Sequence, residues 1–156
     1  MQALLEGVRV LDFTTNVAGP VSTAMLADYG ASVIKVERPG TGDDNRNFPP
    51  MMDGQGFIHF WCNRGKKSVT LNLGDPEGKR IVEALVRECD IVVESYRPGI
   101  MKKFGLDYES LSAIKPDLIY CSVSAYGLVG PYAKRPGYDL IAQGMSGHMD
   151  LNGEPD

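Results

Sequence analysis

The stretch VRVLDFTTNVAGPVSTAMLADYGASVIKVE, Val8 to Glu37, is the most informative about the fold of this chain. It opens with a short apolar run, VRVLDF, and closes with a second one, SVIKVE, and both are typical of buried strands. The turn TTNVAGP between them puts Pro20 where a helix should begin, and this helix should bury Met25 and Leu26 and stop at Gly30. Two strands joined by a helix form the repeating unit of a parallel sheet.

Further strands and helices alternate beyond this stretch. SVTLNL alternates strictly and should place Val69, Leu71 and Leu73 on one face. A helix should follow, with Asp75 as its cap and Pro76 in its first turn. IVVES and LIYCSVS are two more expected strands, with the short helical pieces IMKKFG and YESLSAI between them. The pattern predicts an α/β fold, with a Rossmann-like, mostly parallel sheet and helices on both faces.

One segment departs from this alternation. From Arg38 to Gly65 the chain is polar, with Gly, Pro and Asn scattered through it, and we expect a long loop there. Loops of that length in a compact domain are usually functional or mobile.

Length and charge exclude several classes of protein. The chain has 156 residues, which suits one domain over residues 1–156. The formal net charge is −4 and there is no basic run, so we expect no nucleic-acid partner. No apolar stretch is long enough to span a bilayer, and MQALLEGVRV lacks the layout of a signal peptide. We therefore expect a cytoplasmic protein with no membrane partner.

The cysteines and histidines give no indication of a metal site. Cys62, Cys89 and Cys121 are odd in number, lie far apart and form no CxxC pair, which favours buried thiols in a reducing compartment. His59 and His148 have no neighbour at ligand spacing. We expect no bound metal.

A ligand site is expected outside the carboxyl ends of the strands, as in other open parallel sheets. The backbone N–H groups of the turn TTNVAGP could bind an anionic or polar ligand. Glu37 and Arg38 stand roughly 20–25 residues beyond this turn, where a dinucleotide fold places its ribose-binding acid. However, GxGxxG is absent, so an NAD-dependent enzyme is a weak alternative.

Cations and an aromatic residue add to this pattern. Arg64, Lys66 and Lys67 precede the alternating strand, and Tyr96 and Arg97 follow a later one. Each cation by itself is more often a solvated surface residue. Together they favour a ligand that carries phosphate and a purine, since the planar fork of arginine suits phosphate.

The sequence resembles family III CoA-transferases, the carnitine/bile-acid-inducible group that also contains formyl-CoA transferase and alpha-methylacyl-CoA racemase. The stretches that carry the resemblance extend from Leu5 to Gly147 and include LEGVRVLDFT, LADYGASVIKVERPGTGD, NRGKKSVTLNL, DIVVESYRPGIMKKFGLDYE, LIYCSVSAYGLVGPYAKRPGYD and AQGMSG. Their order and spacing make the resemblance highly specific.

The resemblance implies a Rossmann-like domain that binds coenzyme A, at the N-terminal end of a chain about twice this length or more. Two such chains interlock into a homodimer in this family. Coenzyme A and acyl-CoA are then substrates, and no permanently bound cofactor is expected. The positions that match the family's CoA contacts are Val17, Ala18, Arg38, Leu71, Asn72, Tyr96, Arg97 and Lys103, with Gly137 beside the thioester.

The turn RPGYD bears on the type of reaction. Racemases of the family carry histidine at the position of Tyr138, because they need a base near neutral pH. A tyrosine phenol is a poor base there but can donate a hydrogen bond, so Tyr138 favours transfer over racemisation. Asp139 has two open interpretations, a supporting role beside the thioester or a simple helix cap.

Transfer in the family proceeds through an aspartate carboxylate that attacks the thioester. The motif of that aspartate is expected just beyond Asp156. This chain alone should therefore be inactive. The alternatives to a CoA-transferase are an acyl-CoA racemase of the same family and a nucleotide-binding module without catalysis. The formyl-CoA branch has a functional glutamine at the position of Val17, which disfavours oxalate or formate as the acid.

Overall fold

A computed structural model describes residues 3–154 of the chain. Contacts along the chain divide it into two compact units, Met1–Val123 and Ser124–Asp156. The first unit holds a five-stranded sheet, and the second holds two short helices. A single CoA-binding domain over residues 1–156 stays a prediction.

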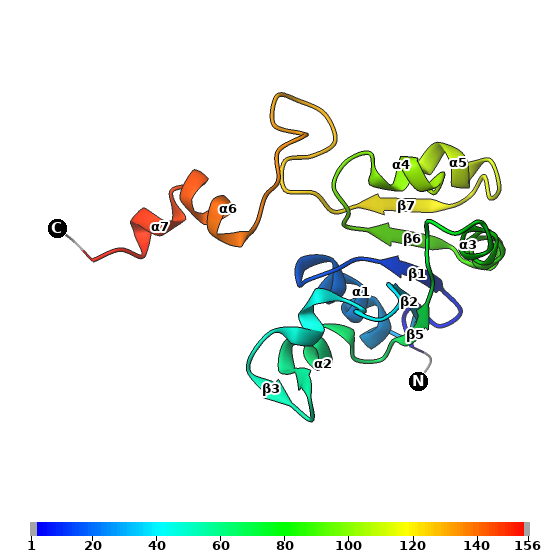
Figure 1. Cartoon of the computed structure of the whole chain (residues 1–156), viewed down its shortest axis with the longest axis horizontal. Helices are drawn as coiled ribbons and strands as arrows, with labels where there is room; N and C mark the ends of the chain where they lie inside the picture. Colours follow the sequence, from blue (N-terminus) through cyan, green and yellow to red (C-terminus); the bar gives the residue numbers. More distant parts are fainter. Residues whose placement is uncertain (1–2, 155–156) are drawn as a thin grey trace. The chain divides into compact units, whose positions relative to one another are not determined.

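The sheet of the first unit is parallel throughout, with the strand order β5-β2-β1-β6-β7 (Figure 1). Its strands are β1 (Arg9–Phe13), β2 (Ser32–Glu37), β5 (Lys67–Thr70), β6 (Ile91–Glu94) and β7 (Ile119–Ser122). In the middle of the sheet Leu11 pairs with Ile34 on one side and with Val92 on the other. The α/β class and the parallel sheet predicted from the sequence are confirmed.

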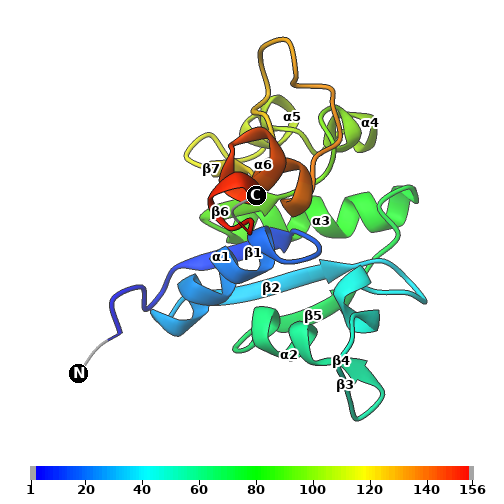
Figure 2. The ribbon, with the colours of Figure 1, turned by 90° about the vertical axis from the view of Figure 1, so that its left-hand side faces the viewer.

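Helices cover both faces of this sheet (Figure 2). Successive residues of β1 point to opposite faces, so Val10 packs in one core cluster and Leu11 in the other. The cluster around Val10 is closed by α1 (Ala18–Asp28), through Leu26 and Ala27. The larger cluster around Leu11 is closed by α3 (Pro76–Glu88), α4 (Ile100–Phe104) and α5 (Tyr108–Ser112).

The helix α3 begins as its sequence predicts. The Asp75 carboxylate accepts a hydrogen bond from the Glu77 N–H at 2.8 Å, and Pro76 is the first helical residue. Its buried side is centred on Val82 and Val86, both without solvent exposure. The strand before it is shorter than predicted and ends at Thr70, although Val69, Leu71 and Leu73 do all pack in one cluster.

The helix α1 differs from the prediction in two respects. It begins at Ala18, so Pro20 is its third residue, and Met25 is 49% exposed rather than buried. The reason is that α1 lies against the sheet through small residues. A Cβ on Gly19 would lie 2.5 Å from the Thr14 Cβ, a distance that real side chains do not reach. The predicted end is confirmed, since α1 stops at Asp28 and Gly30 has a φ of +103°.

The segment from Arg38 to Gly65 is not the long loop that its composition predicts. It contains a short 3₁₀ helix, η1 (Asp44–Asn47), an antiparallel hairpin of β3 (Met51–Met52) and β4 (Gln55–Gly56), and the helix α2 (Phe57–Asn63). The polar residues of this segment are used inside the protein, because Asn45 is fully buried and hydrogen-bonded. Composition alone cannot separate such a segment from a solvated loop.

The second unit contains α6 (Asp139–Met145) and α7 (His148–Leu151). Ahead of these helices the Tyr126 and Tyr132 rings meet edge to face, and the Arg135 guanidinium lies 4.2 Å from the centre of the Tyr132 ring. The helix predicted to open at the RPGYD turn is confirmed as α6.

Within residues 3–154 no helix has the length and apolar character needed to cross a membrane. No group of three or more His, Cys, Asp or Glu side chains in this range could hold a metal ion. Cys62 and Cys89 are buried as expected, whereas Cys121 is exposed, which corrects the expectation of three buried thiols. Cys121 lies on the edge strand β7, in which Ile119 and Cys121 are exposed while Tyr120 and Ser122 are partly buried.

Candidate functional site

The carboxyl ends of the parallel strands bring four of the predicted residues together. Arg38 directly follows β2, Leu71 and Asn72 directly follow β5, and Tyr96 is the second residue after β6. All four line one cleft of about 230 Å³ at this edge of the sheet. Ile100 and Phe104, both from α4, complete its apolar walls, and sequence reasoning did not single them out.

The cleft combines a mainly apolar interior with a cation at its rim. Leu71 is 9% exposed and Tyr96 is half-buried, while Arg38 is exposed. Burial raises the pKa of Tyr96 despite the opposing effect of Arg38, so this side chain stays a neutral phenol. An aromatic and aliphatic pocket with an arginine at its edge can take a purine ring and a phosphate.

Arg38 is held at the rim by neighbours on its own loop. Its Nε donates to the Gly42 carbonyl at 3.3 Å, and one terminal nitrogen forms an exposed ion pair with Asp44. An exposed pair of this kind contributes little stability, so an incoming phosphate can replace Asp44 at low cost.

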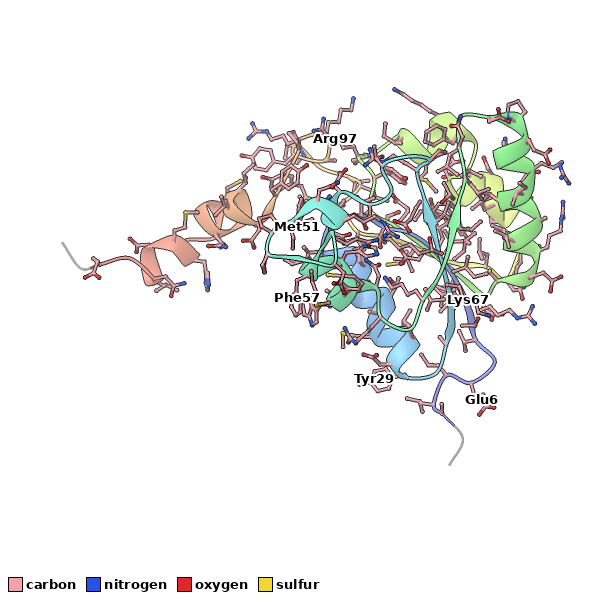
Figure 3. All side chains as sticks on the ribbon, turned by 60° about the horizontal axis from the view of Figure 1, so that its bottom comes forward. Glu6, Tyr29, Met51, Phe57, Lys67 and Arg97 are labelled. Atoms are coloured by element: carbon pink, nitrogen blue, oxygen red, sulfur yellow. The ribbon has the colours of Figure 1, made fainter. Side chains whose placement is uncertain are left out.

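Arg97 and Lys103 are exposed, and they flank the cleft without lining it. Arg97 lies on the loop after β6, as Figure 3 shows, and its carbonyl accepts the Ile100 N–H at 3.0 Å. Lys103 directly precedes Phe104 on α4. Among the described residues neither side chain forms an ion pair, so both cations are available to a ligand.

The turn after β1 carries Val17, which is half-buried, and Ala18, which is exposed. No side chain caps the N-terminus of α1 at Val17. The turn is fastened to the loop after β6, because the Thr15 N–H donates to the Ser95 hydroxyl at 2.9 Å. Asn16, the next residue of the turn, has a φ of +67°, which is uncommon for residues other than glycine.

The loop cations proposed from the sequence, Arg64, Lys66 and Lys67, do not line this cleft. Lys66 is 2% exposed and pairs with Asp12 at 2.9 Å, and burial lowers its pKa against the effect of that carboxylate. Arg64 pairs with Asp28 on α1. Lys67 is exposed at the start of β5, well apart from Arg97 (Figure 3).

Glu37 is also unavailable as a ribose-binding acid. Its carboxylate accepts hydrogen bonds from Arg46 Nε at 2.8 Å, from Arg46 Nη2 at 2.7 Å and from the Ser68 hydroxyl at 2.6 Å. Burial alone would raise the pKa of Glu37, but these hydrogen bonds and the one from the Asp43 N–H outweigh it and lower the pKa to about 2. The NAD alternative therefore loses the acid on which it depended.

Gly137, Tyr138 and Asp139 lie in the second unit. Tyr138 is 66% exposed and occupies the cap position of α6 without a side-chain hydrogen bond to the helix. Asp139 is the first helical residue, and its carboxylate accepts a hydrogen bond from Gln143. Its helix-cap interpretation is therefore wrong. Gly137 needs its lack of a side chain, since a Cβ there would lie 2.2 Å from the Ala125 Cβ.

The fold and the cleft together identify the class of protein. A parallel sheet with a mainly apolar, cation-rimmed cleft outside its carboxyl ends is a Rossmann-like ligand-binding unit. The particular family follows from sequence, because the CoA-transferase family III profile matches residues 5–156. The chain belongs to CoA-transferase family III.

Curated relatives and solved structures agree with this assignment. A succinyl-CoA:glutarate CoA-transferase of Mus musculus is 50% identical over 153 residues, covering 97% of this chain and 35% of that protein. A succinate–glutarate CoA-transferase of Agrobacterium fabrum is 48% identical, covering 97% of this chain and 40% of that protein. A CaiB/BaiF family protein from Brucella suis is similar in structure, with a TM-score of 0.94, 46% identity, and coverage of 100% of this chain and 42% of that one. This chain thus spans well under half the length of each.

Proposed function

We propose that this protein is a CoA-transferase that moves CoA between an acyl-CoA thioester and a free carboxylic acid. The chain described here would supply the CoA-binding portion. The observation that carries the proposal is the single cleft lined by Arg38, Leu71, Asn72 and Tyr96, four of the positions at which the family resemblance predicts CoA contacts.

Each part of CoA has a suitable counterpart around this cleft. The apolar walls formed by Leu71, Tyr96 and Phe104 suit the adenine ring. Arg38 at the rim, with Arg97 and Lys103 beside it, suits the phosphates, and charge-assisted hydrogen bonds to phosphate are among the stronger polar contacts. Asn72 and the turn at Val17 and Ala18 would bind by polar and backbone contacts, and Gly137 would lie beside the thioester.

The proposed chemistry passes through an aspartate that lies beyond this chain. Its carboxylate oxygen would attack the thioester carbonyl, and the CoA thiolate would leave as a mixed anhydride forms. The thiolate would then attack the aspartyl carbonyl of this anhydride, which forms an aspartyl-CoA thioester and releases the first acid. The acceptor acid would repeat these steps in reverse order and leave with CoA. Tyr138 would donate a hydrogen bond to the acyl group, and Asp139 would support it.

The relatives suggest a substrate pair for the first assay. Two of them are named for succinyl-CoA or succinate together with glutarate. We propose succinyl-CoA as the donor and glutarate as the acceptor. A homodimer in the cytoplasm is part of the same proposal and rests on the family resemblance.

Steady-state kinetics of the full-length protein test the reaction type. Transfer of CoA from succinyl-CoA to glutarate should follow ping-pong kinetics, since a covalent intermediate separates the two half-reactions. Incubation of a 2-methylacyl-CoA in heavy water should give no uptake of deuterium at the alpha carbon. Rapid deuterium uptake without acyl transfer would show a racemase instead.

A further inference from the structure

In the turn between β1 and α1, the backbone N–H and carbonyl of Asn16 both form hydrogen bonds with side chains distant in the sequence. The Asn16 N–H donates to Asp43 Oδ1 at 2.9 Å, and the Asn16 carbonyl accepts from Asn45 Nδ2 at 2.6 Å. Asp43 and Asn45 are 2% and 0% exposed. Both bonds go to the backbone of Asn16, the residue with the positive φ, so they fix the turn in this conformation.

A buried lysine, Lys35, contacts the same turn two residues before Asn16. The Lys35 ammonium donates to the Thr14 carbonyl at 2.8 Å and lies 2.7 Å from Asp43 Oδ2. The Lys35 and Asp43 side chains are 2% and 1% exposed. An ion pair this deep is costly to form, and its position beneath the turn suggests a role in conformational specificity rather than in stability alone.

The helix α2 contacts Asn45 through the side chain of His59. His59 Nδ1 lies 2.8 Å from Asn45 Oδ1, and since an amide oxygen only accepts, the ring must donate here. Burial, with Arg46 nearby, lowers the pKa of His59. Asn63 Nδ2 also lies 3.1 Å from His59 Nδ1, and it donates to the His59 carbonyl at 3.1 Å. This orientation of the Asn45 amide leaves its Nδ2 pointing at the Asn16 carbonyl.

We propose that Asp43 and Asn45 are positioning residues that hold the β1–α1 turn in the shape required for CoA binding. The proposal rests on the proposed function, which places Val17 and Ala18 in contact with CoA. It assigns the segment after β2 a role in the site, although neither Asp43 nor Asn45 lines the cleft formed by Arg38, Leu71, Asn72 and Tyr96.

Asn45→Ala in the full-length protein is the direct test. It removes the hydrogen bond to Asn16 without leaving the buried Lys35 unpaired, as Asp43→Asn would. Calorimetric titration should show CoA bound roughly tenfold more weakly. Hydrogen exchange should show faster exchange at the amides of residues 15–18. Val82→Ala, a fully buried substitution on α3, is the control for a general loss of stability.

If Asn45 has a purely structural role, the affinity for CoA should fall together with the melting temperature of each variant. Val82→Ala should then weaken CoA binding as much as Asn45→Ala does. Positioning predicts that only Asn45→Ala weakens it, at a temperature where both variants are folded. If Asn45→Ala does not fold, Asn16→Val takes its place. This change disfavours the positive φ directly and should weaken binding more than Asn16→Gly, which tolerates it.

Equal CoA affinities of wild type and Asn45→Ala, or of Asn16→Val and Asn16→Gly, would overturn the positioning role and leave the proposed function standing. Absence of CoA binding by the wild-type protein would overturn both.

Discussion

Arg38 and Arg97 are the residues on which CoA recognition should depend most directly. Both are exposed at the edge of the sheet where the cleft opens, and Arg97 forms no ion pair among the described residues. Arg38 has only an exposed partner, Asp44. Each can therefore turn toward a phosphate without leaving a buried carboxylate unpaired.

Replacing Arg38 or Arg97 with alanine should weaken CoA binding by roughly tenfold or more, because a charge-assisted contact contributes about 1.5–3 kcal/mol. Isothermal titration of CoA into the full-length protein measures the effect. Lys67→Ala, which removes an exposed cation at the start of β5, is the matched control and should bind normally. Unchanged affinity in both arginine variants would exclude them from the site.

Glu37 should make stability depend on pH. Its pKa falls from 4.5 to about 2 on folding, so its stabilising effect is fully present above pH 4.5 and is lost as the pH falls toward 2. The effect amounts to roughly 3 kcal/mol. The difference in unfolding free energy between wild type and Glu37→Gln should shrink between pH 7 and pH 3 in denaturant titrations. A constant difference would mean that Glu37 keeps an ordinary pKa.

At this scale the sequence located the residues that line the cleft better than it located the buried charges. Arg38 and Tyr96 could be found because each stands just after a strand, whereas Leu71 and Asn72 were expected within a strand and came from the family resemblance. The pairing of Lys66 with Asp12 could not, since the two residues are 54 positions apart and nothing local marks either as buried. A lysine in a polar stretch looks the same whether it is solvated or paired.

At the scale of elements, the close contact between α1 and β1 has a direct consequence. Gly19 leaves no space for a side chain, because a Cβ would overlap Thr14, which is itself fully buried. Gly19→Ala should destabilise the protein by about 1–3 kcal/mol, as expected for overpacking. Thermal or denaturant unfolding measures this.

Gly144→Ala on α6 is the control for that prediction. The nearest atom to its added Cβ is the Met149 sulfur at 3.7 Å, an ordinary contact. Alanine is favoured over glycine inside a helix by about 0.5–1 kcal/mol, so this variant should be neutral or slightly more stable. Similar losses in the two variants would mean that Gly19 is not tightly packed.

The strands and α3 could be predicted because their signals are local: continuous apolar runs, and the Asp75–Pro76 start of the helix. The segment with η1, β3, β4 and α2 could not. Its order comes from hydrogen bonds to distant residues, such as those between Asn45 and Asn16 and between Arg46 and Glu37. Met25 was misplaced for a similar reason, since the buried side of α1 is formed by small residues that carry little hydrophobic signal.

At the scale of the whole molecule, the first unit has large apolar side chains exposed on α1, α2 and the hairpin. Tyr29, Met51 and Phe57 are among them (Figure 3), with exposed fractions of 52%, 52% and 50%. Where such side chains form a contiguous apolar surface, that surface usually marks an interaction site. In the proposed homodimer it would be covered.

Residues 1–156 alone should therefore self-associate. Light scattering at increasing concentration should show a mass above that of the 17.0 kDa monomer. A double variant with Met51→Lys and Phe57→Lys should reduce the association, while Lys102→Ala, an exposed change on α4, should not. A monomer at all concentrations would contradict the expectation.

Covalent labelling tests the central claim, a CoA-transferase whose CoA-binding portion is this chain and whose nucleophile lies beyond it. Full-length protein and residues 1–156 are each incubated with succinyl-CoA labelled in the acyl group, and protein-bound label is counted. The account predicts hydroxylamine-sensitive label on the full-length protein that free glutarate removes, and none on residues 1–156. Stable label on an aspartate of residues 1–156, with Asp139 the first to be checked, or no label on the full-length protein, would contradict it.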